Sequence, residues 1–170
     1  MRFACNKTDP KCKQCAECCK FRDKPVLTDD EDFNLREAMF NKSKVIYLFP
    51  MSRYTISLTE TEKLILEKEA DKQEIKLKIL PKKSFYDEEK DKVYVLDYFL
   101  DYEICPFLKE NKCNIYSLRP EVCKLFPLKS PNMKKDVDDF LTAHPVHNTL
   151  SFKESIKKVK EKLNPQSKSI

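Results

Sequence analysis

The chain has 170 residues, which is enough for one domain with an ordinary hydrophobic core. Charged residues make up 36% of it, yet the net charge is only +5 and the two signs are interspersed. A nucleic-acid surface needs a concentrated basic stripe, so we predict no nucleic-acid partner. Because the chain contains no glycine, it can form neither a P-loop nor a glycine-rich dinucleotide turn.

The hydropathy pattern predicts no membrane segment. No window approaches the roughly 18 apolar residues that are needed to span a bilayer. The first ten residues also lack the apolar stretch of a secretory signal. We therefore predict a cytoplasmic protein, and in that compartment clustered cysteines are more often metal ligands or redox groups than disulfides.

The first part of the chain predicts an irregular loop at residues 3–20, followed by a helix. Thr28 is a typical N-cap, and the acidic residues after it complement the helix dipole. The spacing of the apolar residues predicts that this helix ends near Asn41. Residues 45–49 are apolar and end at a proline, which predicts a short extended segment or a short helix.

A second helix and two strands are predicted next. Thr59 and Glu62 have the spacing of a capping box, which opens a helix that runs to about Ala70. Residues 75–79 alternate apolar and lysine side chains, and residues 92–100 are rich in β-branched and aromatic residues. The polar stretch at 82–91 would link these two strands as an antiparallel pair.

The last part of the chain predicts short elements. Residues 113–116 have the composition of a short strand, and Pro120 suits the start of a brief helix that carries Cys123. The composition of residues 136–142 predicts another helix. A Ser-x-x-Glu capping box at Ser151 heads a terminal helix whose apolar face carries Phe152, Ile156, Val159 and Leu163.

Turns in this chain must form without glycine. Asparagine tolerates the left-handed conformation better than most residues, so the pairs Asn41-Lys42 and Asn111-Lys112 are the expected left-handed positions.

These elements predict the α+β class, as a small, loop-rich domain with short helices and a small antiparallel sheet. The two groups of cysteines, at 12–19 and 105–123, would make it metal-centred. We expect one cysteine-cluster domain over residues 1–170. Its motif halves lie at 12–19 and 105–127, with an insertion at about 43–95 and a C-terminal helical extension at about 132–170.

The cysteines carry the functional signal. Seven of the eight fall into two tight groups that more than eighty residues separate. Thiolates at two-residue spacing can point toward one centre, and a remote group can complete the coordination shell. We therefore predict a metal ion as the partner and these residues as its ligands: Cys12, Cys15, Cys18, Cys19, Cys105, Cys113 and Cys123.

The order of these motifs resembles the YkgJ-type cysteine-cluster family, whose domain is expected to chelate zinc or iron. The matching pieces are the C-x-x-C-x-x-C-C run at 12–19, Leu-Thr-Asp-Asp at 27–30, Cys-Pro-Phe-Leu at 105–108, and residues 113–127. Two positions depart from the family: Ala16 lies where glycine is common, and Lys124 replaces an arginine. Some relatives are flagellin lysine N-methylases, but their activity cannot be carried over residue by residue.

The identity of the metal stays open at this point. Seven thiolates exceed a single four-cysteine zinc site by three. The first run resembles the ligand loop of cubane ferredoxins, and Cys105-Pro106 resembles their remote fourth ligand. We favour an iron–sulfur cluster or iron, with zinc as the alternative. Adjacent side chains diverge, so either Cys18 or Cys19 is spare or the two residues belong to two centres.

Residues outside the thiolate set have smaller predicted roles. Arg119 is expected to donate hydrogen bonds around the centre, and Tyr116 to pack in the core or to contribute its hydroxyl to the same shell. His144 and His147 flank a proline, so they are predicted to be loop histidines rather than ligands. Cys5 is predicted to be a thiol outside the metal site.

The expected function is a metal-binding protein in which the centre has a structural or electron-transfer role. One alternative is a metalloenzyme related to protein lysine methylation or to redox chemistry. A further alternative is a metal carrier, which would require exposed and exchangeable thiolates.

Overall fold

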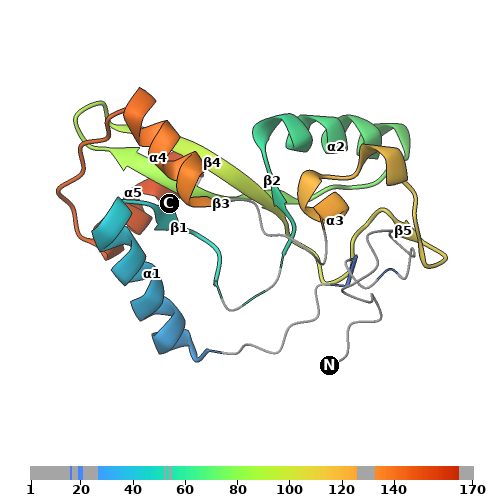
Figure 1. Ribbon diagram of the computed structural model, residues 1–170, viewed down its shortest axis with the longest axis horizontal. Helices are drawn as coiled ribbons and strands as arrows, with labels where there is room; N and C mark the ends of the chain where they lie inside the picture. The colour runs from blue at the N-terminus through green and yellow to red at the C-terminus, as the bar shows by residue number, and fades with distance from the viewer. Residues whose placement is uncertain are drawn as a thin grey trace, which may run out of the picture. The chain divides into compact units, whose positions relative to one another are not determined.

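A computed structural model describes Ala16, Cys19, Lys20 and residues 27–51, 53, 55–125 and 133–164, with only the backbone described at 133–137. Five α-helices and short strands make up the fold (Figure 1), which confirms the α+β class and the small antiparallel sheet among these residues. The helices are α1 (Asp29–Ser43), α2 (Glu60–Lys72), α3 (Glu121–Leu125), α4 (Met133–Ala143) and α5 (Phe152–Leu163), with a 3-10 helix at Tyr116–Leu118. The strands are β1 (Ile46–Tyr47), β2 (Ser57–Leu58), β3 (Ile79–Asp87), β4 (Lys92–Leu100), β5 (Leu108–Lys109) and β6 (Lys112–Cys113).

The chain divides into two compact units. Unit 1 comprises Met1–Lys24, Tyr54–Leu80 and Tyr98–Met133, and unit 2 comprises Pro25–Arg53, Pro81–Asp97 and Lys134–Ile170. The four-stranded sheet has the order β1-β3-β4-β2, and β5 pairs with β6 in a separate two-stranded sheet. The prediction of a single domain over the whole chain stays a prediction.

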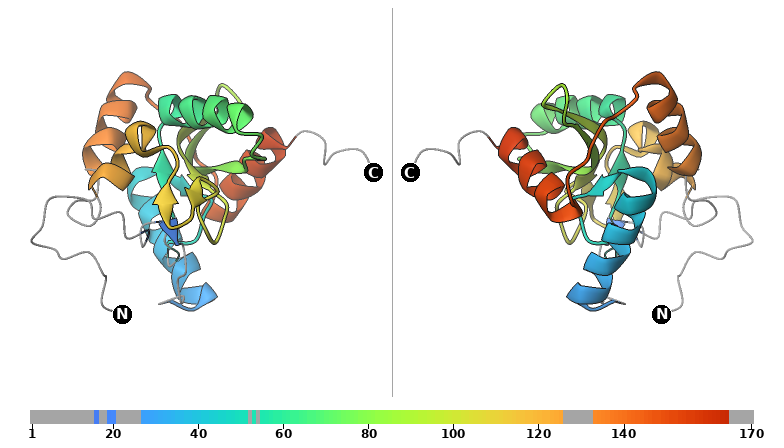
Figure 2. Two further views of the ribbon diagram at one scale, coloured as in Figure 1. Left: turned by 90° about the vertical axis from the view of Figure 1, so that its right-hand side faces the viewer. Right: turned by 90° about the vertical axis from the view of Figure 1, so that its left-hand side faces the viewer.

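Unit 2 is built on β1 and most of β3 and β4. Because successive strand residues face opposite sides of a sheet, two core clusters form. Ile46 and Tyr86 pack with Phe40 of α1 and Phe152 of α5 on one side. The other side carries Val45, Tyr47 and Phe85, against which Phe140 and Leu141 of α4 pack. Figure 1 and Figure 2 show α1 and α5 together at β1, where the three elements contact one another.

Unit 1 holds the third core cluster. Leu58 of β2, Leu66 and Ala70 of α2, and Leu100 at the end of β4 are each at most 2% exposed. The buried side chains of Cys19, Cys105, Phe107 and Ile115 belong to the same cluster. The hydrophobic core of unit 1 is therefore built around the cysteine segments.

Among the described residues, three helices begin with a capping box, in which the N-cap hydroxyl and the N3 glutamate each accept a backbone N–H. The boxes predicted at Thr59 and Ser151 are confirmed, and Thr28 forms the third with Glu31. Each box removes unsatisfied N–H groups from the first turn, which fixes the point where the helix starts.

The first predicted strand is shifted along the chain. Residues 75–78 are not in a strand, and β3 instead occupies most of the stretch predicted as a linker. A side chain replaces the strand partner at 75–78: the Tyr102 hydroxyl donates to the Lys76 carbonyl oxygen at 2.5 Å and accepts from the Lys78 N–H at 2.7 Å. Lys83 is compatible with the sheet interior because its ammonium pairs with Asp97 at 2.6 Å. The strand prediction for 92–100 is confirmed as β4.

Several other predictions need correction. Asn111 is left-handed as predicted, but Asn41 and Lys42 lie inside α1, and the left-handed residue is Lys44, whose N–H donates to the Phe40 carbonyl oxygen at 2.7 Å. The helix continues past the predicted end because its last turn is closed by this bond. The strand predicted at 113–116 stops at Cys113, and a 3-10 helix follows.

Among the described residues, no helix combines the length and the apolar character that crossing a membrane requires.

Candidate metal centre

The second cysteine segment folds back on itself through a tight hairpin. Strands β5 and β6 pair with Leu108 opposite Cys113, and the turn between them places Glu110 and Asn111 at φ values of 47° and 61°. These left-handed residues give the turn the twist that a two-residue hairpin needs. The Asn114 N–H then donates to the Phe107 carbonyl oxygen at 2.9 Å, which brings the residues after Cys113 back beside the start of the segment.

Cys123 is positioned by the short helix α3. Pro120 precedes this helix and is buried, and the Cys123 N–H donates to its carbonyl oxygen at 2.9 Å. The prediction that this proline opens a brief helix with Cys123 is confirmed. A proline fits there because the first helical residues have no intrahelical acceptor for their N–H groups.

The first and second cysteine segments meet through their main chains. The Cys105 N–H donates to the Cys19 carbonyl oxygen at 2.7 Å, and Lys20 and Ile104 form an antiparallel bridge. Before this junction, the Cys19 N–H donates to the Ala16 carbonyl oxygen at 3.0 Å. Two segments that lie far apart in the sequence therefore lie next to each other in unit 1.

The four described cysteines belong to one apolar cluster. Cys19 and Cys105 are 6% and 7% exposed, and Cys113 and Cys123 are half-buried and pack against the same core. Sulfur in such surroundings can act either as a small hydrophobic group or as a soft metal ligand. Burial among Phe107, Ile115 and Leu66 would shield a bound ion from water.

No three His, Cys, Asp or Glu side chains of the described part of the chain are arranged to hold one metal ion. Three of the predicted ligands, Cys12, Cys15 and Cys18, lie outside the described residues, as does Cys5. The set of seven thiolates therefore stays a prediction.

Ala16 has a backbone conformation that is unusual for alanine. Its φ angle is 62°, in the left-handed region, and its side chain is buried. An alanine there costs roughly 1–2 kcal/mol, because its Cβ approaches the neighbouring carbonyl oxygen. Glycine has no Cβ, so this geometry explains why a glycine would suit this stretch of the cysteine run.

Arg119 and Tyr116 contact each other. The guanidinium carbon lies 3.7 Å from the centroid of the Tyr116 ring, and Nε donates to the Tyr116 carbonyl oxygen at 3.0 Å. Tyr116 is 39% exposed, so the prediction that it packs in the core is wrong. The stacking partner keeps the ring at the surface, since an arginine head prefers to stay hydrated. Their predicted role around the centre stays a prediction.

The two histidines lie in unit 2 and are exposed, as predicted for loop histidines. His144 stacks on Phe140 with the ring centroids 4.9 Å apart. His147 Nδ1 lies 3.6 Å from a carboxylate oxygen of Glu89. His144 therefore packs against an aromatic ring, and His147 lies beside a surface carboxylate.

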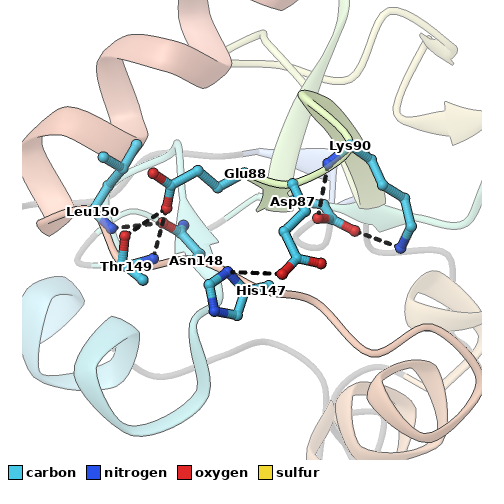
Figure 3. Close-up of polar contacts among 8 residues, drawn as sticks. Asp87, Glu88, Lys90, His147, Asn148, Thr149 and Leu150 are labelled. Carbon is cyan, nitrogen blue, oxygen red and sulfur yellow. Dashed lines mark hydrogen bonds and ion pairs between the residues drawn. The ribbon is translucent and has the colours of Figure 1, made fainter.

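Figure 3 shows how the loop around His147 is attached to the turn between β3 and β4. The Glu88 carboxylate accepts the Thr149 N–H at 2.9 Å and the Thr149 hydroxyl at 2.7 Å. These two bonds lower the pKa of the Glu88 carboxyl. The Glu88 N–H in turn donates to the His147 carbonyl oxygen at 2.8 Å.

Sequence reasoning missed the part that helix α2 has in the cysteine cluster. In the sequence, Leu64, Ile65 and Leu66 are three consecutive apolar residues of this helix, and their composition does not separate them. In the structure Leu64 and Ile65 are 56% and 41% exposed, whereas Leu66 and Ala70 are 1% exposed. The i,i+4 spacing of the last two was the available signal, because such residues share one helix face.

Comparison with protein families supports this description. The model of the CxxCxxCC family, described as "Putative zinc- or iron-chelating domain", matches residues 11–146. Comparisons with curated proteins and with solved structures gave no match. The matched range contains both cysteine segments and covers most of the chain. The chain therefore belongs to the CxxCxxCC family.

Proposed function

We propose that this protein holds iron, as an iron–sulfur cluster or as mononuclear iron, through thiolates of both cysteine segments, with zinc as the alternative. The centre has a structural or electron-transfer role in this proposal. The observation that carries it is the main-chain junction, in which the Cys105 N–H donates to the Cys19 carbonyl oxygen at 2.7 Å. Membership of a family of zinc- or iron-chelating domains supports metal binding in general.

The donor chemistry fits such a group. Thiolates are ligands for iron–sulfur clusters, zinc and Cu(I), whereas Mg²⁺ and Ca²⁺ prefer oxygen. Cys19, Cys105, Cys113 and Cys123 would be joined by Cys12, Cys15 and Cys18, because the described cysteines do not hold an ion by themselves. Bound iron–sulfur would supply one-electron redox chemistry, and zinc would supply only structural cross-linking.

The burial of Cys19 and Cys105 favours a resident centre over a metal carrier. A carrier must expose its thiolates to exchange its ion with another protein, and these two side chains are almost inaccessible. A reducing cytoplasm, where we place the protein, would keep all these thiols available for ligation. Ligation would also contribute to folding, since an ion tied to both segments stabilises only the folded state.

The proposal is tested by purifying the full chain without oxygen and measuring its metal, its acid-labile sulfide and its absorption spectrum. Iron and sulfide together with a broad visible absorption band support an iron–sulfur cluster. Iron without sulfide supports a mononuclear site. Stoichiometric zinc in a colourless protein would support the alternative and exclude electron transfer. A protein that retains neither metal, after reconstitution as well, would refute the proposal.

A further inference from the structure

Helix α2 contacts the second cysteine segment at its N-terminal end through Glu62. One carboxylate oxygen of Glu62 accepts the Thr59 N–H at 2.9 Å and so completes the capping box of α2. The other oxygen accepts the backbone N–H of Glu121 at 2.7 Å. Glu121 is the first residue of α3, the helix that carries Cys123. A single carboxylate therefore joins the starts of two helices.

The C-terminal end of α2 contacts the same segment at a second point. The Asn114 side-chain amide donates to the side-chain oxygen of Gln73, the residue that follows the last turn of α2. Asn114 is the neighbour of Cys113 in the chain. The Gln73 amide donates to Glu69 at 2.9 Å, which orients the Gln73 oxygen toward Asn114.

Between these ends, α2 packs against the cysteine cluster. Leu66 and Ala70 are buried in the core that contains Cys19 and Cys105. From Glu62 to Gln73 the helix rises by about 16 Å, and an α-helix of this length is stiff compared with the hairpin and the single helical turn that it contacts. Helix α2 therefore contacts the residue that follows Cys113 and the helix start that precedes Cys123.

We propose that Glu62 and Gln73 are positioning residues for the metal centre, because they fix where Cys123 and Cys113 stand before an ion binds. This inference rests on the proposed function. Groups that hold the ligands in place raise affinity by removing conformations that cannot bind. Losing a partner that bonds a ligand directly lowers metal affinity roughly 10- to 100-fold, and Glu62 and Gln73, which bond neighbours of the ligands, are expected at the lower end of that range. Both residues lie between the two cysteine segments, outside the short motif pieces at 12–19, 27–30, 105–108 and 113–127.

The chain supplies matched controls, because three helices start with the same capping box. Glu62→Ala, Glu31→Ala and Glu154→Ala each remove the N3 carboxylate of a box. Among these three glutamates, only Glu62 has a described bond to the cysteine segment. Comparison with Glu31→Ala and Glu154→Ala therefore separates the loss of the bond to Glu121 from the loss of a capping box. Gln73→Ala is compared with Lys72→Ala, which removes an exposed ion pair in the same turn of α2.

Two measurements on the full chain test the inference. In metal-free protein, hydrogen exchange at residues 113–125 is expected to be faster in Glu62→Ala than in Glu31→Ala and Glu154→Ala. In competition with a chromophoric chelator, the affinity for Zn²⁺ is expected to fall about tenfold in Glu62→Ala and in Gln73→Ala, and by less than about twofold in the controls. With Co²⁺ as an optical probe, the two test variants should also change the thiolate charge-transfer bands.

The outcomes separate the two ideas. If wild-type protein binds Zn²⁺ and Co²⁺ and all variants match it in affinity, spectrum and exchange, the positioning role is overturned and the proposed function stands. If wild-type protein binds no metal, the proposed function fails, and with it the inference. Should Glu62→Ala fail to fold, Gln73→Ala against Lys72→Ala decides the same question, since this pair leaves the capping box of α2 intact.

Discussion

The backbone N–H of Cys105 lies 2.7 Å from the carbonyl oxygen of Cys19 and donates a hydrogen bond to it. The adjacent bridge between Lys20 and Ile104 continues this pairing. The two cysteine segments are therefore joined by main-chain bonds that involve no sulfur atom. A thiol replaced by a hydroxyl leaves these bonds in place, so the effect of such a change on metal content can be separated from an effect on the junction.

Replacing Cys15 or Cys123 with serine is expected to remove stoichiometric metal and to lower the soluble yield. A hydroxyl is a poor ligand for soft metals, and a lost ligand also removes binding energy that stabilises the fold. Cys5→Ser should change neither quantity, because Cys5 lies outside the predicted site. Elemental analysis of the three purified variants checks this, and full metal occupancy in Cys15→Ser and Cys123→Ser would contradict the predicted ligand set.

Ala16→Gly is expected to stabilise the protein by less than about 1 kcal/mol, because the loss of the buried methyl group offsets part of the gain. The φ angle of Ala16 is 62°, and glycine adopts this conformation without the steric cost of a Cβ, which outweighs its greater freedom in the unfolded chain. Ala38→Gly is the matched control, since Ala38 is exposed within α1 and the same change there should destabilise by about 1 kcal/mol. Urea unfolding measures the change in the free energy of unfolding for both variants. If both variants were destabilised, the proposed steric cost of alanine at position 16 would be contradicted.

Asp32→Ala is expected to destabilise unit 2 by about 3 kcal/mol, as for other buried ion pairs that lose one partner. The Asp32 side chain is 4% exposed, and its carboxylate accepts Arg36 Nε at 2.8 Å and the Met51 N–H at 2.7 Å. The substitution removes the carboxylate that accepts from Arg36 Nε and from the Met51 N–H. Asp29→Ala removes a carboxylate from the exposed first turn of the same helix and should cost about 0.5 kcal/mol. Thermal unfolding of the two variants distinguishes these values. A small loss of stability in both variants would show that the bonds of the Asp32 carboxylate contribute little.

Lys82→Met is expected to stabilise the protein near neutral pH, and the gain should shrink as the solution becomes alkaline. Burial lowers the pKa of Lys82 from 10.5 to about 8, against an opposing effect of Asp97. Below pH 8 the lysine is protonated in both the folded and the unfolded state, so folding carries the full cost of a buried ammonium. Between pH 8 and 10.5 the unfolded state binds more protons, and the stability contributed by this group rises with pH.

The lowered pKa of Lys82 limits the stability gained in Lys82→Met to about 3 kcal/mol. The measurement is the difference in free energy of unfolding between Lys82→Met and wild type, taken from about pH 7 to about pH 10. Lys72→Met is the control, because Lys72 has an exposed side chain, and this variant should differ little from wild type in its free energy of unfolding. A constant difference for Lys82→Met would contradict the lowered pKa.

Local sequence patterns predicted the parts of this fold that depend on neighbouring residues. The capping boxes at Thr59 and Ser151 and the strand at 92–100 are found where the sequence placed them. Such signals are reliable because a cap or an alternating strand is satisfied within a few residues. The strand predicted at 75–79 was misplaced because its backbone bonds go to Tyr102, more than twenty residues away.

The sequence by itself determined the family. It also predicted thiolate ligands, because seven cysteines stand at spacings that suit a soft metal. Only the tertiary structure decided that Cys19 lies beside Cys105, that Tyr116 is at the surface, and that Glu62 reaches the start of α3. Each of these facts depends on a contact between segments distant along the chain. Such contacts depend on how the whole core packs, so a local sequence pattern cannot predict them.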